Sequence, residues 1–367
     1  MHWIIKYARF LLLLAPAIGL ATPAFAQARS PLLSDSQEAG SVIVFPKFIR
    51  GTVTVDGVAT PRTEIEVGVV CPQGVTCPEH QPIKIRFHWV CGTTEANLAG
   101  SFVCKETDFD VTTSVFGKVV FNADGTPITG SAPVAPGTPP AAECNRGYLI
   151  GWVINPANDQ PIKFDGLVGD AVLRESNTAA SAYGAIPIQA DPTLANGAAI
   201  TTTADALTGT QSLVFDGGSG HYQAVTGAIQ ADVKFDNGSV APFNATYLTL
   251  LTLDVRSNLP NFPTFVDLNF YNETERLTST ATEFICWEEV QLSDLDASLN
   301  QMAQGVRKGL VVSGQAIKTP FDGVFDRAGP VTLLGLVDTI EGPNADRSYI
   351  SPMYNNSVPI GTTFVPF

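Results

Sequence analysis

The sequence is poor in positive charge. Its 367 residues include 21 Lys and Arg against 35 Asp and Glu, which gives a formal net charge of −14. Proteins that bind nucleic acid or anionic lipid gather cations against phosphate, and an acidic surface repels both. We therefore expect no nucleic-acid partner.

Long apolar runs are missing after the first 26 residues, because no later stretch is apolar over the ~18 residues that a membrane helix needs. We expect no integral membrane helix. The first 26 residues have basic Lys6 and Arg9, a short apolar run and an Ala24-Phe25-Ala26 site, the pattern of a cleaved signal peptide. We therefore expect export to the periplasm, the cell surface or the medium. The segment holds two basic and no acidic residues, so its removal leaves a net charge of −16.

Motifs of familiar catalytic and metal sites are also missing. No two cysteines have the C-x-x-C spacing of a structural zinc site. Ser219 and His221 lie in the glycine-rich stretch "DGGSGHY", but this stretch lacks the G-x-S-x-G pattern and the following helix of a nucleophile elbow. We interpret it as a hairpin turn, and we expect no catalytic residue, no metal and no cofactor, with Ca²⁺ as the one cation left open.

The six cysteines all follow the predicted signal peptide. An even number in an exported protein predicts disulfides, although six cysteines allow 15 pairings. Closeness in sequence favours two bonds within the first half of the chain, and the remaining two cysteines would tie the halves together unless the last one stays free. The expected pairs are Cys71–Cys77, Cys91–Cys104 and Cys144–Cys286.

Short runs rich in Val, Ile, Thr and Phe alternate with turn residues and predict an all-β fold. The segment 83–89 alternates between apolar and polar residues, and so does the segment 266–271. The residues expected to face a core are Ile83, Ile85, Phe87, Val266, Leu268 and Phe270, and those expected to face outward are Lys84, Arg86 and His88.

The pattern Phe-x-Cys-x-Glu occurs twice, at 102–106 and at 284–288. Six further segment pairs match in the same order: 41–45 with 212–215, 63–69 with 249–255, 83–88 with 266–271, 146–154 with 307–317, 166–172 with 335–341, and 183–188 with 349–360. We interpret these matches as an internal duplication and expect two tandem Ig-like β-sandwich domains. A short helix is expected at 293–305 in the second copy.

The expected organisation follows from this repeat. It comprises a signal peptide at 1–26, a first domain at 27–189 with a long Pro- and Gly-rich loop at 123–143, an unstructured linker at 190–210 and a second domain at 211–367.

Carboxylates cluster after both Phe-x-Cys blocks. Alternation places the first three on one strand face, where they repel one another unless a cation lies among them. Bound Ca²⁺ or another ligand would relieve the repulsion, paired carboxylates also serve sugar hydrolysis, and a solvated strand face needs neither. The candidate binding residues are Glu106, Asp108, Asp110, Glu288, Glu289, Asp294 and Asp296.

Three tryptophans lie on expected strands: Trp89, Trp152 and Trp287. Exposed tryptophans would stack on sugar rings, whereas buried ones fill a core. Within apolar strands we favour the core.

The blocks "SVIVFPKF", "GYLIGWVINPANDQPIKFDGLVGDAV", "TLLTLDVRSNLPNFPTFVDLNFYNE" and "EFICWEEVQL" resemble a loose group of exported bacterial proteins. The resemblance covers most of the chain after the signal peptide. It implies export and a β-rich fold, and it brings no activity or site residues.

Together these observations favour an exported non-catalytic protein of the surface or periplasm, with a binding or structural role and a protein or polysaccharide partner. One alternative is a carbohydrate-active enzyme that uses the acidic residues after the Phe-x-Cys blocks. Another is an outer-membrane β-barrel, which the terminal Phe367 favours and which Pro359 and Pro366 oppose in a last strand that must pair.

Overall fold

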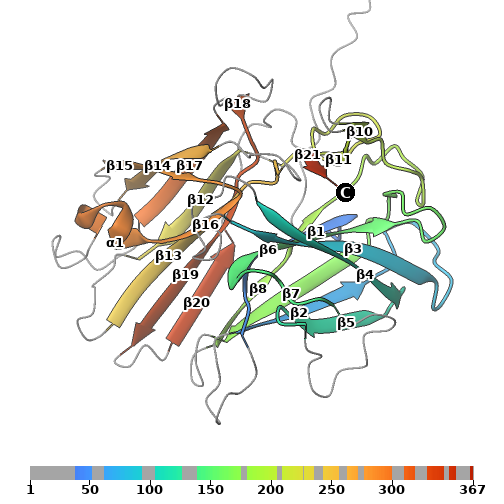
Figure 1. Cartoon of the computed structure of the whole chain (residues 1–367), viewed down its shortest axis with the longest axis horizontal. Helices are drawn as coiled ribbons and strands as arrows, with labels where there is room; N and C mark the ends of the chain where they lie inside the picture. The colour runs from blue at the N-terminus through green and yellow to red at the C-terminus, as the bar shows by residue number, and fades with distance from the viewer. Residues whose placement is uncertain are drawn as a thin grey trace, which may run out of the picture. The chain divides into compact units, whose positions relative to one another are not determined.

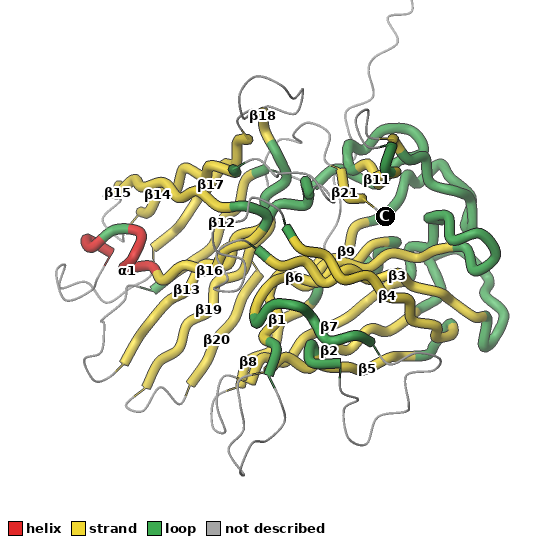
Figure 2. Tube along the Cα trace, viewed as in Figure 1, coloured by secondary structure: helices red, strands yellow, loops and turns green. Residues whose placement is uncertain are grey.

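The structure is a computed structural model (Figure 1), and almost all of its regular structure is β-strand (Figure 2). All the described residues belong to one compact unit, Pro31–Phe367. The all-β prediction is confirmed, while the expected signal peptide and most of the 123–143 loop lie outside the described residues. The residues described are 38–51, 62–92, 104–125, 139–174, 180–204, 209–225, 227–234, 243–255, 263–271, 277–299, 310–318, 329–342, 347–352 and 364–366.

Two antiparallel sheets form in the first half of the chain. Sheet A has the order β4 (Lys105–Ser114), β3 (Pro82–Cys91), β6 (Arg146–Ile154), β1 (Val42–Ile49), β9 (Ile186–Ile188). Sheet B has the order β5 (Lys118–Asn122), β2 (Arg62–Val69), β7 (Leu167–Arg174), β8 (Ala180–Gly184).

Two further antiparallel sheets form in the second half. Sheet C has the order β15 (Leu277–Phe284), β14 (Thr264–Tyr271), β17 (Leu310–Lys318), β12 (Ala228–Val233), with the short β18 (Gly329–Pro330) on β17. Sheet D has the order β16 (Trp287–Gln291), β13 (Phe243–Leu251), β19 (Leu334–Gly342), β20 (Arg347–Pro352). A small fifth sheet joins β10 (Thr203–Ala204), β11 (Gln211–Val214) and β21 (Phe364–Pro366).

The strand order is the same in the two halves. β4, β3, β6 and β1 of sheet A take the places of β15, β14, β17 and β12 of sheet C, and β5, β2, β7 and β8 those of β16, β13, β19 and β20. β1 pairs with both β6 and β9, whereas in the second half β12 pairs with β17 and β11 with β21. The internal duplication remains a prediction, which this shared order supports.

The two Phe-x-Cys blocks do not hold matching places. Cys104 lies just before β4, whereas Cys286 lies just after β15, the strand that corresponds to β4. The two copies of this motif therefore lie at opposite ends of corresponding strands, one before β4 and the other after β15.

The residues expected to face a core do so. Ile85 and Phe87 are fully buried between sheets A and B, and Val266 and Leu268 between sheets C and D. The outward prediction for His88 is wrong, since its side chain is only 2% exposed.

Sheet A is buried on both faces, which explains that error. One face packs on sheet B, while Val44, Ile150 and Trp152 on the other face pack against Leu253 and Trp287 from the second half. All eight residues of β1 are buried. When both faces of a strand are covered, the side chains that point to either face are buried. Its sequence then shows no alternation that would identify an exposed face.

Three disulfides are present, and only Cys71–Cys77 was predicted correctly. The other two bonds join Cys91 to Cys144 and Cys104 to Cys286. Cys91 does not pair with Cys104 because successive side chains of a strand point to opposite faces of the sheet. Cys91 lies in the core between sheets A and B, whereas Cys104 lies in the core on the opposite face of sheet A.

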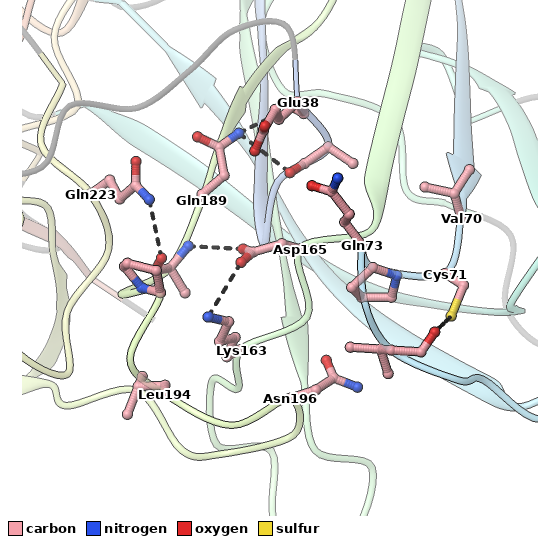
Figure 3. Close-up of a pocket in the computed structure, with 15 residues that line it drawn as sticks. Glu38, Val70, Cys71, Gln73, Lys163, Asp165, Gln189, Leu194, Asn196 and Gln223 are labelled. Atoms are coloured by element: carbon pink, nitrogen blue, oxygen red, sulfur yellow. Dashed lines mark hydrogen bonds and ion pairs between the residues drawn. The ribbon is translucent and has the colours of Figure 1, made fainter.

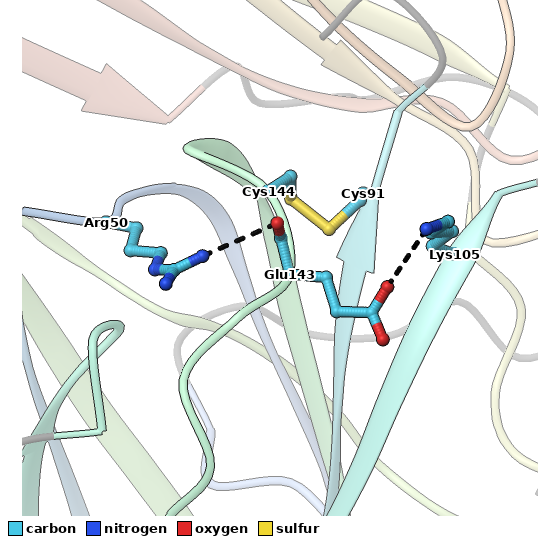
Figure 4. The surroundings of a disulfide bond; sticks show 5 residues. All are labelled: Arg50, Cys91, Lys105, Glu143 and Cys144. Atoms are coloured by element: carbon cyan, nitrogen blue, oxygen red, sulfur yellow. Dashed lines mark hydrogen bonds and ion pairs between the residues drawn. A yellow bond between two sulfur atoms is a disulfide. The ribbon is translucent and has the colours of Figure 1, made fainter. Parts of the chain in front are cut away.

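Cys144 reaches Cys91 because it lies just before β6, the strand that pairs with β3 (Figure 4). Their Cα atoms lie 5.8 Å apart. Glu143, the residue before Cys144, has two partners. Its backbone oxygen accepts a hydrogen bond from Arg50, and its carboxylate pairs with Lys105 at 3.3 Å.

The helix expected at 293–305 is shorter than its periodicity suggested. α1 spans Leu292–Leu295, a 3-10 turn η1 follows at Ala297–Leu299, and the extended backbone of Asp296 separates them. Residues 300–305 lie outside the described part.

The segment 190–210, expected to be an unstructured linker, is held by backbone hydrogen bonds where it is described. Lys163 N donates to Ala198 O at 2.8 Å, and Ile200 N donates to Pro161 O at 2.9 Å. Among the described residues, no helix is both long and apolar enough to span a membrane.

Candidate functional site

Two features stand out as candidate sites: a row of charged side chains on β3 and β4, and a polar groove beside the Cys71–Cys77 loop. The row contains the first group of predicted binding residues. The groove contains none of them.

The row pairs cations of β3 with carboxylates of β4. Arg86 and Asp110 are direct cross-strand partners, and the guanidinium donates to both carboxylate oxygens at 2.9 and 3.3 Å. Lys84 Nζ lies 2.9 Å from Asp110 and 2.7 Å from Asp159. Burial by itself would raise the pKa of Asp110, but Arg86 and Lys84 outweigh it and hold that pKa below its ordinary value. Two protein cations thus balance a carboxylate for which Ca²⁺ was one of the open alternatives.

The next pair along the row differs, because its β3 member is a histidine instead of a lysine or an arginine. His88 is the cross-strand partner of Asp108, and Glu106 lies two residues away on the same face of β4. His88 Nε2 lies 3.4 Å from Asp108 Oδ1, and Nδ1 lies 3.9 Å from Glu106 Oε2. The ring of Trp152 packs edge-on against the imidazole, with the two ring centres 4.6 Å apart.

Burial sets the protonation state of this group. It lowers the pKa of His88 to about 3, with Arg86 lowering it further, so the imidazole is neutral at ordinary pH. Burial also raises the pKa of Asp108, although the side chain reaches solvent. The structure therefore places Glu106 and Asp108 together around a neutral histidine.

The second acidic group is dispersed. Glu288 and Glu289 are neighbours on β16 and point to opposite sides: Glu288 accepts from Thr282, and burial raises its pKa. Asp294 is exposed on α1. Asp296 accepts from the backbone N–H of Ser298, which lowers its pKa.

Glu289 belongs to a buried ionic cluster that links the two halves of the chain. Its carboxylate lies 2.5 Å from Lys47 Nζ and also pairs with Arg146. Lys47 Nζ lies 2.8 Å from Asp338 as well. Lys47, Glu289 and Asp338 are all at least 93% buried, so this carboxylate has structural partners already.

The polar groove has a volume of about 710 Å³ (Figure 3). Its walls come from 38–39, the Cys71–Cys77 loop, 163–165, 189–196 and Gln223. These segments are far apart in the sequence, and the turn at 189–196 joins them because β9 delivers it to the edge of sheet A.

Asp165 organises the floor of the groove. One of its carboxylate oxygens accepts from Ser41 Oγ at 2.6 Å and from Ala190 N at 2.8 Å. Lys163 lies 3.7 Å from Asp165 and donates to the backbone oxygen of Asp191 at 2.8 Å. Charged groups thus hold the backbone in place.

Four amide side chains surround this floor. Gln189 donates to the backbone oxygens of Glu38 and Ala39, and Gln223 donates to that of Ala190. Figure 3 shows Gln73 and Asn196 on the other side of Asp165, and both are exposed. The groove therefore presents amides and the Glu38 carboxylate to solvent, with Val70, Pro72 and Leu194 as apolar lining.

The stretch "DGGSGHY" forms a tight turn, but Phe215 and Tyr222 at its two ends form a parallel bridge, so the predicted hairpin is not present there. Gly217 and Gly220 adopt positive φ angles of 69° and 82°, which suit glycine. Asp216 Oδ1 accepts from Gly218 N and lies 2.7 Å from His221 Nδ1, while Ser219 is exposed. Asp216 thus fixes the imidazole as part of the turn.

The tryptophans fill cores, as predicted. Trp89 and Trp152 are fully buried, and Trp287 is 2% exposed. Trp287 Nε1 donates to the backbone oxygen of Pro46 at 2.9 Å, so this residue joins the two halves.

The groove was missed from the sequence because its residues share no local pattern. The one available signal was the Cys71–Cys77 loop, whose short spacing marks a rigid rim. His88 was not among the predicted binding residues. The apolar–polar alternation along 83–89 indicated an exposed side chain there, whereas the side chain is buried.

A comparison with models of known protein families found no match, and a comparison with curated protein sequences found none either.

Proposed function

We propose that the protein is an exported, non-catalytic binding protein whose groove takes up a segment of a polysaccharide. The observation that carries this proposal is the polar groove of about 710 Å³ with its amide lining. That volume lies in the range of ordinary ligand sites, roughly 300–1,000 Å³.

The lining favours a hydroxyl-rich neutral ligand. An amide offers both donors and an acceptor, which match the hydroxyl groups of a sugar. Gln73 and Asn196 are exposed and placed to meet a ligand, whereas Gln189 and Gln223 are held by backbone oxygens. The apolar patches of Val70 and Leu194 suit the C–H faces of sugar rings.

Three disulfides support export, because such bonds form and persist in oxidising compartments. They indicate an oxidising environment. The predicted signal peptide is the second argument for export, and the periplasm, the cell surface and the medium remain the proposed locations.

The competing proposal is a carbohydrate-active enzyme that uses the carboxylates after the Phe-x-Cys blocks. None of the candidate carboxylates from Glu106 to Asp296 is among the residues that line the groove. Glu106 and Asp108 face His88, whereas Glu289 faces Lys47 and Arg146. A glycosidase needs two carboxyl groups at opposite sides of one sugar bond, and the candidate carboxylates do not meet this need at the groove. The carboxylates of the groove itself are Glu38 and Asp165, and Asp165 already accepts from Ser41 and Ala190, so the binding role is favoured.

Fractionation of the producing cells tests the location. Membranes are washed with carbonate and intact cells are treated with protease. We expect protein that washes off membranes or is already free, and protease cleavage of intact cells would place it at the surface. Protein that stays in the cytosol would contradict export.

Binding is tested with purified, untagged, oxidised protein and a panel of soluble oligosaccharides: cello-, xylo-, malto- and chito-oligosaccharides. We expect saturable binding of at least one of them without release of new reducing ends. Cleavage of a bound sugar would support the enzyme instead.

A further inference from the structure

The imidazole of His88 is a buried polar group that the surrounding side chains do not satisfy. It is 2% exposed, and neither ring nitrogen has a hydrogen-bond partner. Buried polar atoms in folded proteins are nearly always paired, because burying an unpaired one destabilises the fold. An ion bound at the nitrogen is one of the few arrangements that would satisfy it.

Carboxylates stand where the other ligands of such an ion would lie. One ligand atom each from His88, Glu106 and Asp108 can be chosen so that all three lie within 4.8 Å of one another. Zinc bonds to nitrogen and oxygen are about 2.0–2.2 Å long, so neighbouring ligand atoms of a tetrahedral site are roughly 3.3 Å apart. The 3.4 Å between His88 Nε2 and Asp108 Oδ1 matches this spacing. The nearest Glu106 oxygen lies 3.9 Å from the other ring nitrogen, Nδ1, within the spread of the three-residue group.

The local charge also favours a divalent cation. Lys84 and Arg86 are the cations of the row, and they face Asp110 and Asp159. Glu106 and Asp108 bring two carboxylates to the His88 end of the row.

We propose that His88, Glu106 and Asp108 bind one divalent transition-metal ion of the zinc class. The exposed Asp108 carboxylate provides the route from solvent, and water completes the coordination. This site is separate from the groove and does not depend on the sugar-binding proposal.

The imidazole decides between zinc and calcium. Ca²⁺ takes six to eight oxygen ligands, whereas imidazole nitrogen suits Zn²⁺ and its neighbours. The cluster offers one nitrogen and two carboxylates, and Asp110 is already bound to Arg86 and Lys84. We therefore expect selectivity for Zn²⁺.

Calorimetric titration of Zn²⁺ into metal-stripped, untagged, oxidised protein tests the proposal, with Ca²⁺ titrated separately. The variants are Asp108→Asn and Glu106→Gln. Glu66→Gln, on β2 and paired with Lys118, is the matched control because it removes a carboxylate outside the cluster. Asp108 is 62% exposed, so its substitution should leave the fold intact, which circular dichroism verifies.

The expected result is one Zn²⁺ per chain, with binding weakened at least about tenfold in Asp108→Asn and Glu106→Gln and unchanged in Glu66→Gln. Ca²⁺ should not bind at the same concentration. No Zn²⁺ binding, equal binding by Asp108→Asn and the unmodified protein, or a preference for Ca²⁺ would each overturn the proposal.

Discussion

Cys104 and Cys286 form a disulfide with each other, so the two Phe-x-Cys blocks are joined directly. The bond spans 182 positions of sequence and lies in the core that both halves of the chain share. Trp287, next to Cys286, extends the junction by donating to Pro46. The repeated motif therefore marks a covalent junction between the halves.

This junction should contribute strongly to stability. Loop-closure entropy predicts about 5 kcal/mol for a bond across 182 positions and about 2 kcal/mol for one across 6. We expect the double Cys→Ser change at 104 and 286 to lower the free energy of unfolding more than the same change at 71 and 77. Urea unfolding of both variants measures the difference. An equal loss in the two would contradict the role of the long bond.

The buried ionic cluster supports the same junction. Replacing Glu289 by Gln leaves Lys47 and Arg146 with one carboxylate fewer, and breaking a buried ion pair costs about 3–5 kcal/mol. We expect Glu289→Gln to destabilise the protein by an amount of this order at neutral pH. Glu66→Gln, at an exposed pair with Lys118, should leave stability nearly unchanged, because exposed ion pairs contribute little. Similar losses in the two variants would argue against the cluster.

The same cluster predicts a pH dependence. Burial would raise the pKa of Glu289, but Lys47 and Arg146 outweigh it and hold that pKa below its ordinary value. A carboxyl with a lowered folded-state pKa stabilises the protein above its unfolded pKa, and this contribution is lost as pH falls through the folded value. The difference between the unmodified protein and Glu289→Gln should therefore shrink in acid. Urea unfolding across a pH series checks this, and a constant difference would contradict it.

Gly92 allows a close approach between the halves. A Cβ at this position would clash with the backbone carbonyl of Trp287. We expect Gly92→Ala to lower stability by about 1–3 kcal/mol, as overpacking does. Gly184→Ala is the control, because a Cβ there meets nothing within 4 Å. Thermal unfolding compares the two variants. An unchanged melting temperature in Gly92→Ala would contradict a close approach that only glycine allows.

The sequence predicted well what depends on local pattern. Alternation placed Phe87 and Leu268 in cores, and apolar context placed Trp152 inside. The prediction of exposed side chains from the sequence failed where a second layer of the protein covers the outer face of a sheet. His88 is buried because the other half of the chain packs on the outer face of sheet A, and no periodicity within β3 records that layer.

Disulfide pairing failed for a related reason. Cys91 and Cys104 are near in sequence, but they point to opposite faces of sheet A. Cys144 and Cys286 reach them through the strand order, which closeness in sequence does not report. The groove was equally hidden, since Lys163, Gln189 and Gln223 meet only after sheet A has formed.

The most direct test of the account is the affinity of groove variants for the oligosaccharide that the panel selects. The double variant Gln73→Ala/Asn196→Ala removes two exposed amides from the groove, and Gln230→Ala removes an exposed amide from β12, outside it. Two lost hydrogen bonds should weaken binding about tenfold, since each is worth about 0.5–1.5 kcal/mol. We expect this loss in calorimetric titration of the double variant, with Gln230→Ala binding as tightly as the unmodified protein. Unchanged affinity in the double variant would contradict the groove as the binding site.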